Sequence, residues 1–466
     1  MKQKHKISNE ILKACDIRGI VGSQLDTQDA YFVGKAFGSI LIRKAEKSCI
    51  VGYDGRLSSL ELSQKLIQGL QESGINVIDV GLVPTPVVYF AIHHLKADAG
   101  IIVTASHNPS EYNGFKFQLK DRPFHGDDIQ EMGELCAAGC FSSGSGRYNK
   151  ADIKDAYVEY LIGFLDVPES CDLSVVWDPG HGASAAVLSA FLKRLPGKHY
   201  AICNEVDGTF PCHHPDPSLE ENLEHLKQAV LENEADLGIA FDGDGDRLGI
   251  IDGKGKMLLG DQLLVLFARD LLKRRPASKI MSEVKASRFF TDDVISHGGE
   301  AVIWKVGHTN QKEKMRFENI PLAGETSGHM FFEENRGLDD GMFASVKLLN
   351  ILMAHPLKLS EIREAFPRYH DSGEIRIPLE TAKRKALIEE ITLRMIHDKR
   401  SFLDIDGIRT ETADGFWMIR ASNTQPHMTI RCEAASEEGL RDCMADLDRQ
   451  LELSGIPLTK KIRYSH

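Results

Sequence analysis

The sequence predicts an α/β protein: three similar mixed α/β domains and a smaller C-terminal α+β domain around a central cleft. Three observations lead to this fold. A strand–helix–strand pattern occurs three times, each repeat continues into another apolar strand that ends in a polar loop, and the last hundred residues lack the pattern. Strand–helix–strand units of this length form mostly parallel sheets with right-handed crossovers.

The length of 466 residues predicts three or four domains rather than one. We place the domains at residues 1–150, 151–253, 254–366 and 367–466.

Each repeat begins with a short apolar strand, continues through a helix and returns in a second strand. The first repeat is expected at Cys49–Tyr53, Ser58–Ser73 and Asn76–Val80. The second is expected at Ser174–Trp177, Ala183–Leu195 and Tyr200–Cys203, and the third at Lys279–Val284, Ser287–His297 and Ala301–Trp304.

A further apolar strand follows each repeat and ends in a polar loop. The strands are Ala99–Val103, Leu237–Phe241 and Ile320–Ala323, and the loops are Thr104–Pro109, Asp242–Arg247 and Gly324–His329. Ligands of open α/β sheets bind beyond the carboxyl ends of the strands. Three loops in equivalent positions therefore predict one shared cleft.

The C-terminal domain has no parallel unit. Strands are expected at Glu374–Ile377, Gly415–Arg420 and Met428–Glu433, and a helix at Glu438–Leu453. This order indicates an α+β domain. It carries a fourth polar loop, Arg420–Pro426.

Composition narrows the class of protein. The net charge is −12 and no long basic tract occurs, so we expect no nucleic-acid partner. Nine cysteines without a C-x-x-C motif indicate a reduced protein without a disulfide framework. The basic N-terminus has no apolar signal core after it, and no apolar run is long enough to cross a membrane. These features predict a cytoplasmic enzyme with no membrane partner.

Asp242, Asp244 and Asp246 alternate with glycines directly after a buried strand. Two like charges 4 Å apart repel by roughly 1–4 kcal/mol at effective dielectric constants between 80 and 20, and a divalent cation removes that cost. Carboxylate oxygens suit Mg²⁺. A calcium-binding EF-hand loop would need a glycine and a glutamate where Arg247 and Gly253 stand, and a solvated acidic turn does not explain the apolar strand. The pattern therefore favours a Mg²⁺ site.

Ser106 lies in the first polar loop, T-A-S-H-N-P. A serine at a strand end is commonly a cap or turn residue, and the G-x-S-x-G motif of serine hydrolases is absent. Beside a metal loop, however, a serine hydroxyl is suited to carry a phosphoryl group covalently. Its phosphate would supply one oxygen to the metal, which places Ser106 among the expected metal ligands.

The third and fourth loops offer groups for a sugar phosphate. Glu325 and Ser327 suit vicinal hydroxyls, and His329 is a candidate acid–base group, although these letters alone favour an ordinary polar turn. In the fourth loop an arginine stands beside small donors, a combination that suits a phosphate dianion as well as a turn. The residues of that loop are Arg420, Ser422, Asn423 and Thr424.

Together the four loops resemble those of the α-D-phosphohexomutase superfamily, specifically its bacterial phosphomannomutase/phosphoglucomutase members. All four signatures occur in the family order, and the resemblance covers nearly the whole chain. It implies that Ser106 is the phosphoserine and that Asp242, Asp244 and Asp246 bind Mg²⁺. It also implies one loop per domain around the cleft.

The resemblance assigns substrate-binding roles as well. Glu325 and Ser327 would read sugar hydroxyls, and His329 would lie in the catalytic cleft. The fourth loop would hold the phosphate that is not transferred. The remaining residues are Arg247 near the phosphate or sugar, Arg18 as a phosphoserine contact, Lys116 as a candidate general base, and Lys285 and His308 along the substrate path.

Two positions depart from the family pattern. Cys15 stands where a bulky residue is usual, which puts any packing made by that residue in doubt. Gln425 replaces a glutamate or threonine in the fourth loop and carries no charge that would repel phosphate.

The implied reaction interconverts hexose 6-phosphate and hexose 1-phosphate, with mannose or glucose as the sugar, through a phosphoserine and a hexose 1,6-bisphosphate that also serves as activator. A Mg²⁺-dependent phosphatase would share the aspartates but needs no second phosphate grip. A non-catalytic sugar-phosphate sensor could have lost Ser106 or an aspartate, and none of these residues is lost here. The expected partners are small sugar phosphates, and the chain is expected to be a monomer or weak dimer. The preferred sugar and the general base stay open at this point.

Overall fold

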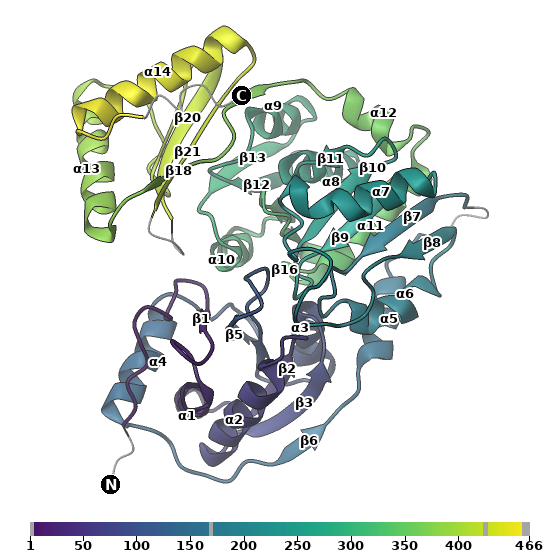
Figure 1. Ribbon diagram of the computed structural model, residues 1–466, viewed down its shortest axis with the longest axis vertical. Helices are drawn as coiled ribbons and strands as arrows, with labels where there is room; N and C mark the ends of the chain where they lie inside the picture. Colours follow the sequence, from purple (N-terminus) through teal and green to yellow (C-terminus); the bar gives the residue numbers. More distant parts are fainter. Residues whose placement is uncertain (1–3, 167–170, 423–426, 459–466) are drawn as a thin grey trace.

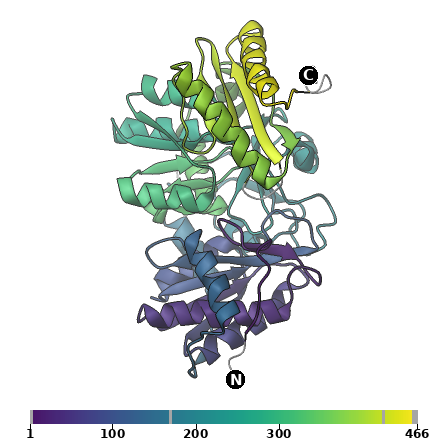
Figure 2. The ribbon, with the colours of Figure 1, turned by 90° about the vertical axis from the view of Figure 1, so that its left-hand side faces the viewer.

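The computed structural model describes residues 4–166, 171–422 and 427–458, and its four sheets follow one another along the chain (Figure 1). The N-terminal sheet and its helices lie at one end of the molecule. The C-terminal domain lies at the other end, as both ribbon views show (Figures 1 and 2).

The first sheet has the strand order β1-β5-β4-β2-β3-β6. Its strands are β1 (Ile17–Ile20), β2 (Ser48–Tyr53), β3 (Asn76–Leu82), β4 (Ala99–Val103), β5 (Tyr112–Leu119) and β6 (Tyr148–Lys150). The accompanying helices are α1 (Thr27–Arg43), α2 (Ser59–Glu72), α3 (Thr85–His94) and α4 (Asp127–Ala138). Strand β2 pairs in parallel with β3 and β4, as the strand–helix–strand pattern predicts.

The second sheet has the order β11-β10-β9-β7-β8. It contains β7 (Ser174–Asp178), β8 (Lys198–Ala201), β9 (Leu237–Phe241), β10 (Leu248–Asp252) and β11 (Met257–Leu258). Its helices are α5 (Lys154–Ile162), α6 (Ala185–Leu192), the 3₁₀ turn η1 (Glu220–Leu223) and α7 (Glu224–Glu232). Strand β11 of this sheet lies beyond residue 253, where the sequence places the domain boundary.

The third sheet has the order β13-β12-β14-β15-β16. Its strands are β12 (Lys279–Glu283), β13 (Glu300–Trp304), β14 (Leu322–Gly324), β15 (Met330–Phe332) and β16 (Leu338–Asp339), with the 3₁₀ turn η2 (Glu333–Asn335) between the last two. Its helices are α8 (Gly260–Arg274), α9 (Arg288–Ser296), α10 (His308–Glu318), α11 (Gly341–Ala354) and α12 (Leu359–Glu364).

The C-terminal domain is an antiparallel sheet with two long helices. The strands are β17 (His370–Asp371), β18 (Ile375–Pro378), β19 (Ile408–Glu411), β20 (Gly415–Ala421) and β21 (His427–Ala434). The helices are α13 (Thr381–His397) and α14 (Glu437–Leu453). Because β21 pairs antiparallel with β17, β18 and β20, the α+β prediction is confirmed.

Each of the first three sheets is mixed, because the strand after the polar loop turns back beside the strand before it. Strands β4 and β5, β9 and β10, and β14 and β15 all pair antiparallel. The three polar loops are therefore hairpin connections. As a result, side chains of the return strands, such as Lys116 on β5, lie beside the loops.

Hydrophobic packing joins the domains. One core runs through the second and third sheets and reaches α3 of the first, whereas the C-terminal domain has a separate core that includes Trp417. A small cluster of Val284, Phe416 and Met418 connects the C-terminal domain to the third sheet. Within the described residues, no helix has the length and apolar character needed to cross a membrane.

Candidate active site

The hairpin between β4 and β5 carries Ser106, whose side chain is 1% exposed. Ser106 has a φ of 52°, in the left-handed region that residues other than glycine seldom adopt. Arg56, a buried arginine, holds this loop by donating to the carbonyl oxygens of Ser106 (2.7 Å) and Asn108 (2.6 Å). Arg18 reaches the same loop and donates to Asn108 Oδ1 at 2.5 Å.

Ser106 meets the second domain through its hydroxyl. Its Oγ donates to Asp242 Oδ2 at 2.7 Å, and Asp242, Asp244 and Asp246 are fully buried with carboxylate oxygens within 4.8 Å of one another. Burial and the two neighbouring carboxylates raise the pKa of Asp242 well above its usual value.

The three aspartates fit a metal ion. In the part of the chain that the structure describes, Asp244 Oδ1 and Asp246 Oδ1 have no hydrogen-bond donor. Buried carboxylate oxygens without a donor are costly, and a cation satisfies them. The donor set is all oxygen, which is the chemistry of a hard divalent cation.

Lys116 supplies positive charge to this cluster. Its Nζ donates to Asp244 Oδ2 at 2.7 Å and to Asp246 Oδ2 at 2.5 Å. Burial opposes the charge, but the carboxylates outweigh it and raise the pKa of Lys116 well above its usual value. The ammonium is therefore protonated in this arrangement, and the role of Lys116 as a general base stays a prediction.

Arg247 and His329 connect the metal loop to the third domain. Arg247 Nε donates to His329 Nε2 at 2.9 Å and lies 3.9 Å from Asp242 Oδ2. His329 Nδ1 lies 3.1 Å from Asp339 Oδ2, and His308 Nδ1 lies 3.4 Å from the same oxygen. The other carboxylate oxygen, Asp339 Oδ1, lies 2.5 Å from Lys312 Nζ. Burial and the nearby Lys312 charge lower the pKa of His308 to about 4. His308 is consequently neutral near pH 7.

The third polar loop holds a fixed carboxylate. Glu325 Oε1 accepts from the backbone N–H of Gly307 at 2.7 Å, and Oε2 accepts from Ser327 Oγ at 3.2 Å. Burial raises the pKa of Glu325. Cys15 lies nearby, because its Sγ accepts from the Thr309 hydroxyl at 3.1 Å. This small side chain therefore forms a contact between the first domain and the N-terminus of α10.

Lys285 and Arg420 lie where the third and fourth domains meet. Lys285 Nζ is 3.6 Å from Glu374 Oε2, and Arg420 Nε donates to Asp406 Oδ2 at 3.2 Å. Asp406 also accepts from the backbone N–H of Val306 at 3.1 Å. In the described ranges, no hydrogen bond or ion pair joins Lys285 or Arg420 to Ser106 or the aspartates. The structure thus brings the residues of the first three loops together, and leaves these two at a separate domain contact.

The fourth loop is described only in part. Arg384 donates to the carbonyl oxygen of Ser422 at 2.6 Å. Asn423, Thr424 and Gln425 lie outside the described residues.

Sequence reasoning missed three residues of the site. Arg56 supports the Ser106 loop, Thr85 donates to Asp244 Oδ2 at 2.5 Å, and Asp339 lies between His308 and His329. Arg56 follows a predicted strand in the segment Y-D-G-R, which was a usable signal. Thr85 and Asp339 belong to the site through tertiary contacts alone.

Comparison with known proteins assigns the family. Models of the phosphoglucomutase/phosphomannomutase family match in order along the chain: alpha/beta/alpha domain I at residues 9–138, domain II at 155–255, domain III at 259–369 and the C-terminal domain at 374–450.

Relatives of similar length agree with this match. A phosphomannomutase/phosphoglucomutase of Pseudomonas putida is 39% identical, covering 93% of this chain and 94% of its own. A phosphoglucomutase of Neisseria gonorrhoeae is 38% identical, covering 93% and 95%. The crystal structure of a family protein from Burkholderia thailandensis has a TM-score of 0.91 at 37% identity, covering 96% of this chain and 98% of that one.

Three α/β domains, a C-terminal domain and a buried serine against three carboxylates define an enzyme of the phosphohexomutase class, which interconverts hexose 1- and 6-phosphates. The chain belongs to the phosphoglucomutase/phosphomannomutase family.

Proposed function

We propose that the chain interconverts mannose or glucose 6-phosphate and the corresponding 1-phosphate by way of a phosphorylated Ser106 and a hexose 1,6-bisphosphate. The observation that carries this proposal is the 2.7 Å hydrogen bond from Ser106 Oγ to Asp242 Oδ2, within a buried carboxylate cluster that also holds Lys116. A serine in this position is surrounded by charges suited to a phosphoryl group rather than by the groups of a serine hydrolase.

Asp242, Asp244 and Asp246, with an oxygen from the phosphorylated Ser106, are the proposed ligands of Mg²⁺. When bound, Mg²⁺ withdraws negative charge from the phosphoryl group during transfer. The protein's own fixed charges act beside it. Arg247 Nε lies 3.9 Å from Asp242 Oδ2, and Arg18 approaches the loop through Asn108, so both guanidinium groups are placed to bind phosphate oxygens.

In the transfer step the bond between phosphorus and Ser106 Oγ breaks as a free sugar hydroxyl forms a bond to the same phosphorus. Ser106 Oγ leaves with the bonding electron pair and takes up a proton, which restores the serine hydroxyl. The hydroxyl proton goes to a base, for which we propose His329 or Lys116. Each must first give up a partner, because Arg247 donates to His329 Nε2 and Lys116 is held by two carboxylates. A phosphate that draws Arg247 away would free the imidazole nitrogen.

The bisphosphate must then turn end over end, so the phosphate and hydroxyl contacts must serve both orientations. We assign Arg420, Ser422, Asn423 and Thr424 to the phosphate that is not reacting, and Glu325 and Ser327 to the O3 and O4 hydroxyls. Lys285 and His308 complete the substrate path. Glu325 suits its role because two hydrogen bonds fix its carboxylate.

A phosphorus NMR assay with glucose 1-phosphate and Mg²⁺ tests the proposed function. Formation of glucose 6-phosphate supports the mutase. Release of inorganic phosphate alone would indicate a phosphatase, and binding without turnover would indicate a sensor.

Replacing Arg420 with alanine is expected to raise KM by about tenfold or more with a smaller fall in kcat. A contact to the non-reacting phosphate exists in both ground and transition states, so its loss weakens binding more than chemistry. Steady-state kinetics with glucose 1-phosphate measure the two parameters. Lys383→Ala, which removes an exposed lysine of the same domain, is the control. Wild-type kinetics for the Arg420 variant at low substrate would contradict the assignment.

Mannose and glucose phosphates are both expected to be substrates, with kcat/KM values within about tenfold, or roughly 1.4 kcal/mol. A site that binds the bisphosphate in two opposed orientations can read features that nearly coincide after the turn, namely the phosphates and the O3–O4 pair. The C2 hydroxyl lies at different places in the two orientations, and a buried group made to bond it would be left unpaired in one of them.

Steady-state kinetics with mannose 1-phosphate and with glucose 1-phosphate, at one concentration of Mg²⁺ and activator, give the ratio of the two kcat/KM values directly. A preference of a thousandfold or more would show that a residue outside these loops reads C2.

A further inference from the structure

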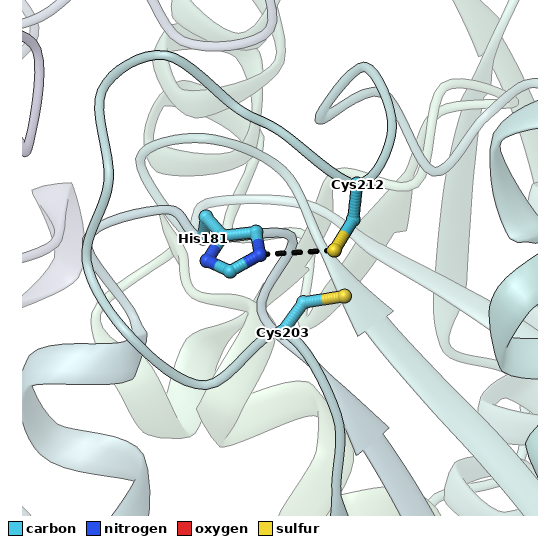
Figure 3. A group of neighbouring side chains, drawn as sticks. All are labelled: His181, Cys203 and Cys212. Carbon is cyan, nitrogen blue, oxygen red and sulfur yellow. Dashed lines mark hydrogen bonds between the residues drawn. The ribbon is translucent and has the colours of Figure 1, made fainter.

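Two loops of the second domain bring together a group of metal-binding side chains that the Ser106 site does not use. Strand β7 ends at Asp178, and the loop after it contains His181. The second loop follows β8 and contains Cys203, Cys212 and His213. The donor atoms of His181, Cys203 and Cys212 lie within 4.8 Å of one another, and Figure 3 shows the imidazole and both thiols converging.

His181 is oriented as a metal-binding histidine is. Its Nδ1 lies 2.8 Å from the carbonyl oxygen of Glu205, which can only accept, so Nδ1 carries the proton. The lone pair of Nε2 therefore faces Cys212 Sγ at 3.1 Å. A backbone carbonyl that fixes the tautomer in this way is the usual second partner of a histidine bound to a metal.

The two loops are joined by the backbone at the same place. The His181 N–H donates to the carbonyl oxygen of Cys203 at 3.0 Å, and the Asp207 N–H donates to the carbonyl oxygen of His181 at 3.0 Å. His181 (φ 59°) and Cys203 (φ 46°) both adopt the left-handed backbone region that is unfavourable for their side chains. Two unfavourable conformations are thus retained where they direct donor atoms to one point.

His213 supports the cluster from outside. Its Nε2 lies 3.0 Å from Asp178 Oδ2 and its Nδ1 lies 3.0 Å from the carbonyl oxygen of His214, so neither nitrogen offers a free lone pair. Asp178 is fully buried, lies beside Cys203 and is held by His213.

We propose that His181, Cys203 and Cys212 form a binding site for a thiophilic divalent cation, Zn²⁺ in the first instance, with a solvent molecule in the fourth position. One nitrogen and two sulfur donors suit Zn²⁺ rather than Mg²⁺. Zn–N and Zn–S bonds at tetrahedral angles require a nitrogen–sulfur distance of about 3.5 Å, so His181 and Cys212 need to separate only slightly. Cys212 is exposed, which provides a route for the ion and room for the solvent ligand.

The bound ion would fix the loops that support the candidate active site. Phe210, which lies between Cys203 and Cys212 in the chain, packs its ring 5.1 Å from the guanidinium carbon of Arg56, and Arg56 donates to the carbonyl oxygen of Ser106. On the other loop, the Ala183 N–H donates to the carbonyl oxygen of Gly243 at 2.9 Å, between two of the aspartates. Through these two contacts a bound ion would hold the Ser106 loop and the aspartate loop in place.

Titration with Co²⁺ tests the site, because thiolate ligands give Co²⁺ an intense charge-transfer band that carboxylates do not. We expect one such Co²⁺ per chain, displaced by equimolar Zn²⁺ and insensitive to excess Mg²⁺. Cys212→Ser should weaken Zn²⁺ binding by at least about 100-fold, since even partners of metal ligands contribute 10- to 100-fold. Cys171→Ser, in the same domain, should leave the band unchanged.

Asp244→Asn separates this site from the carboxylate cluster, and the thiolate band should persist in that variant. Circular dichroism of Cys212→Ser verifies that the fold is retained. Absence of the band in wild-type protein, or an unchanged band in Cys212→Ser, would overturn the site. A Cys203–Cys212 disulfide without bound metal in the protein isolated in air would overturn it as well.

Discussion

Replacing Ser106 with alanine is expected to lower kcat by about 10⁴-fold or more, because removal of a covalent nucleophile eliminates the proposed route rather than weakening it. The fold should be retained, since the change removes one oxygen from a loop that Arg56 still holds by its carbonyl groups. Coupled assay of glucose 6-phosphate formation measures the loss, with glucose 1,6-bisphosphate supplied as activator.

Ser63→Ala is the matched control, because it also removes a buried hydroxyl of the first domain, one that donates to the carbonyl oxygen of Leu60 within α2. It should retain wild-type turnover. Substantial mutase activity in the Ser106 variant would exclude a phosphoserine route, whatever the control shows.

Asp244→Asn is expected to raise the Mg²⁺ concentration needed for half-maximal activity by at least about 10- to 100-fold and to lower kcat as well. The change removes one negative charge from the proposed metal ligands while keeping the shape of the side chain. It also weakens the hold on Lys116, whose ammonium donates to Asp244 and Asp246.

Activity measured across a Mg²⁺ series after treatment with EDTA gives both values. Asp236→Asn serves as the control, since Asp236 precedes β9, at the opposite end of that strand from the carboxylate cluster, and accepts from the Ser174 N–H. Unchanged activity of wild-type protein in EDTA would contradict a metal site at the aspartates.

Much of the fold could be predicted because its signals are local. The strands Ala99–Val103 and Leu237–Phe241 match the structure residue for residue, since each is a buried apolar run ended by polar residues. The antiparallel return strands β5 and β10 were not predicted. Their pairing depends on which strand lies beside them in space, and the sequence does not record that directly.

Boundaries were less accurate where apolar runs are short or irregular. Helix α6 occupies Ala185–Leu192 rather than Ala183–Leu195, and β14 begins at Leu322 rather than Ile320. Gly182 and Gly243 approach closely beside the start of α6, which leaves the preceding residues in a turn.

In the site, too, local sequence signals could be recognised, whereas contacts between distant residues could not. The aspartates are close in sequence, and their spacing alone indicated a shared ligand. Thr85 and Asp339 belong to the site through tertiary contacts, Thr85 with Asp244 and Asp339 with the two histidines, so their positions emerged only from the folded structure. The left-handed conformations of Ser106, His181 and Cys203 were likewise absent from any residue pattern, because these residue types do not favour that region.

The fate of a labelled phosphoryl group tests the central claim most directly. Enzyme phosphorylated with ³²P, with the label mapped to a peptide containing Ser106, is mixed with excess unlabelled glucose 1-phosphate and Mg²⁺. We predict that the label leaves the protein within a single turnover and appears in glucose 1,6-bisphosphate and then in the hexose monophosphate pool. Label that stays on the protein, or that is released only as inorganic phosphate, would contradict the account.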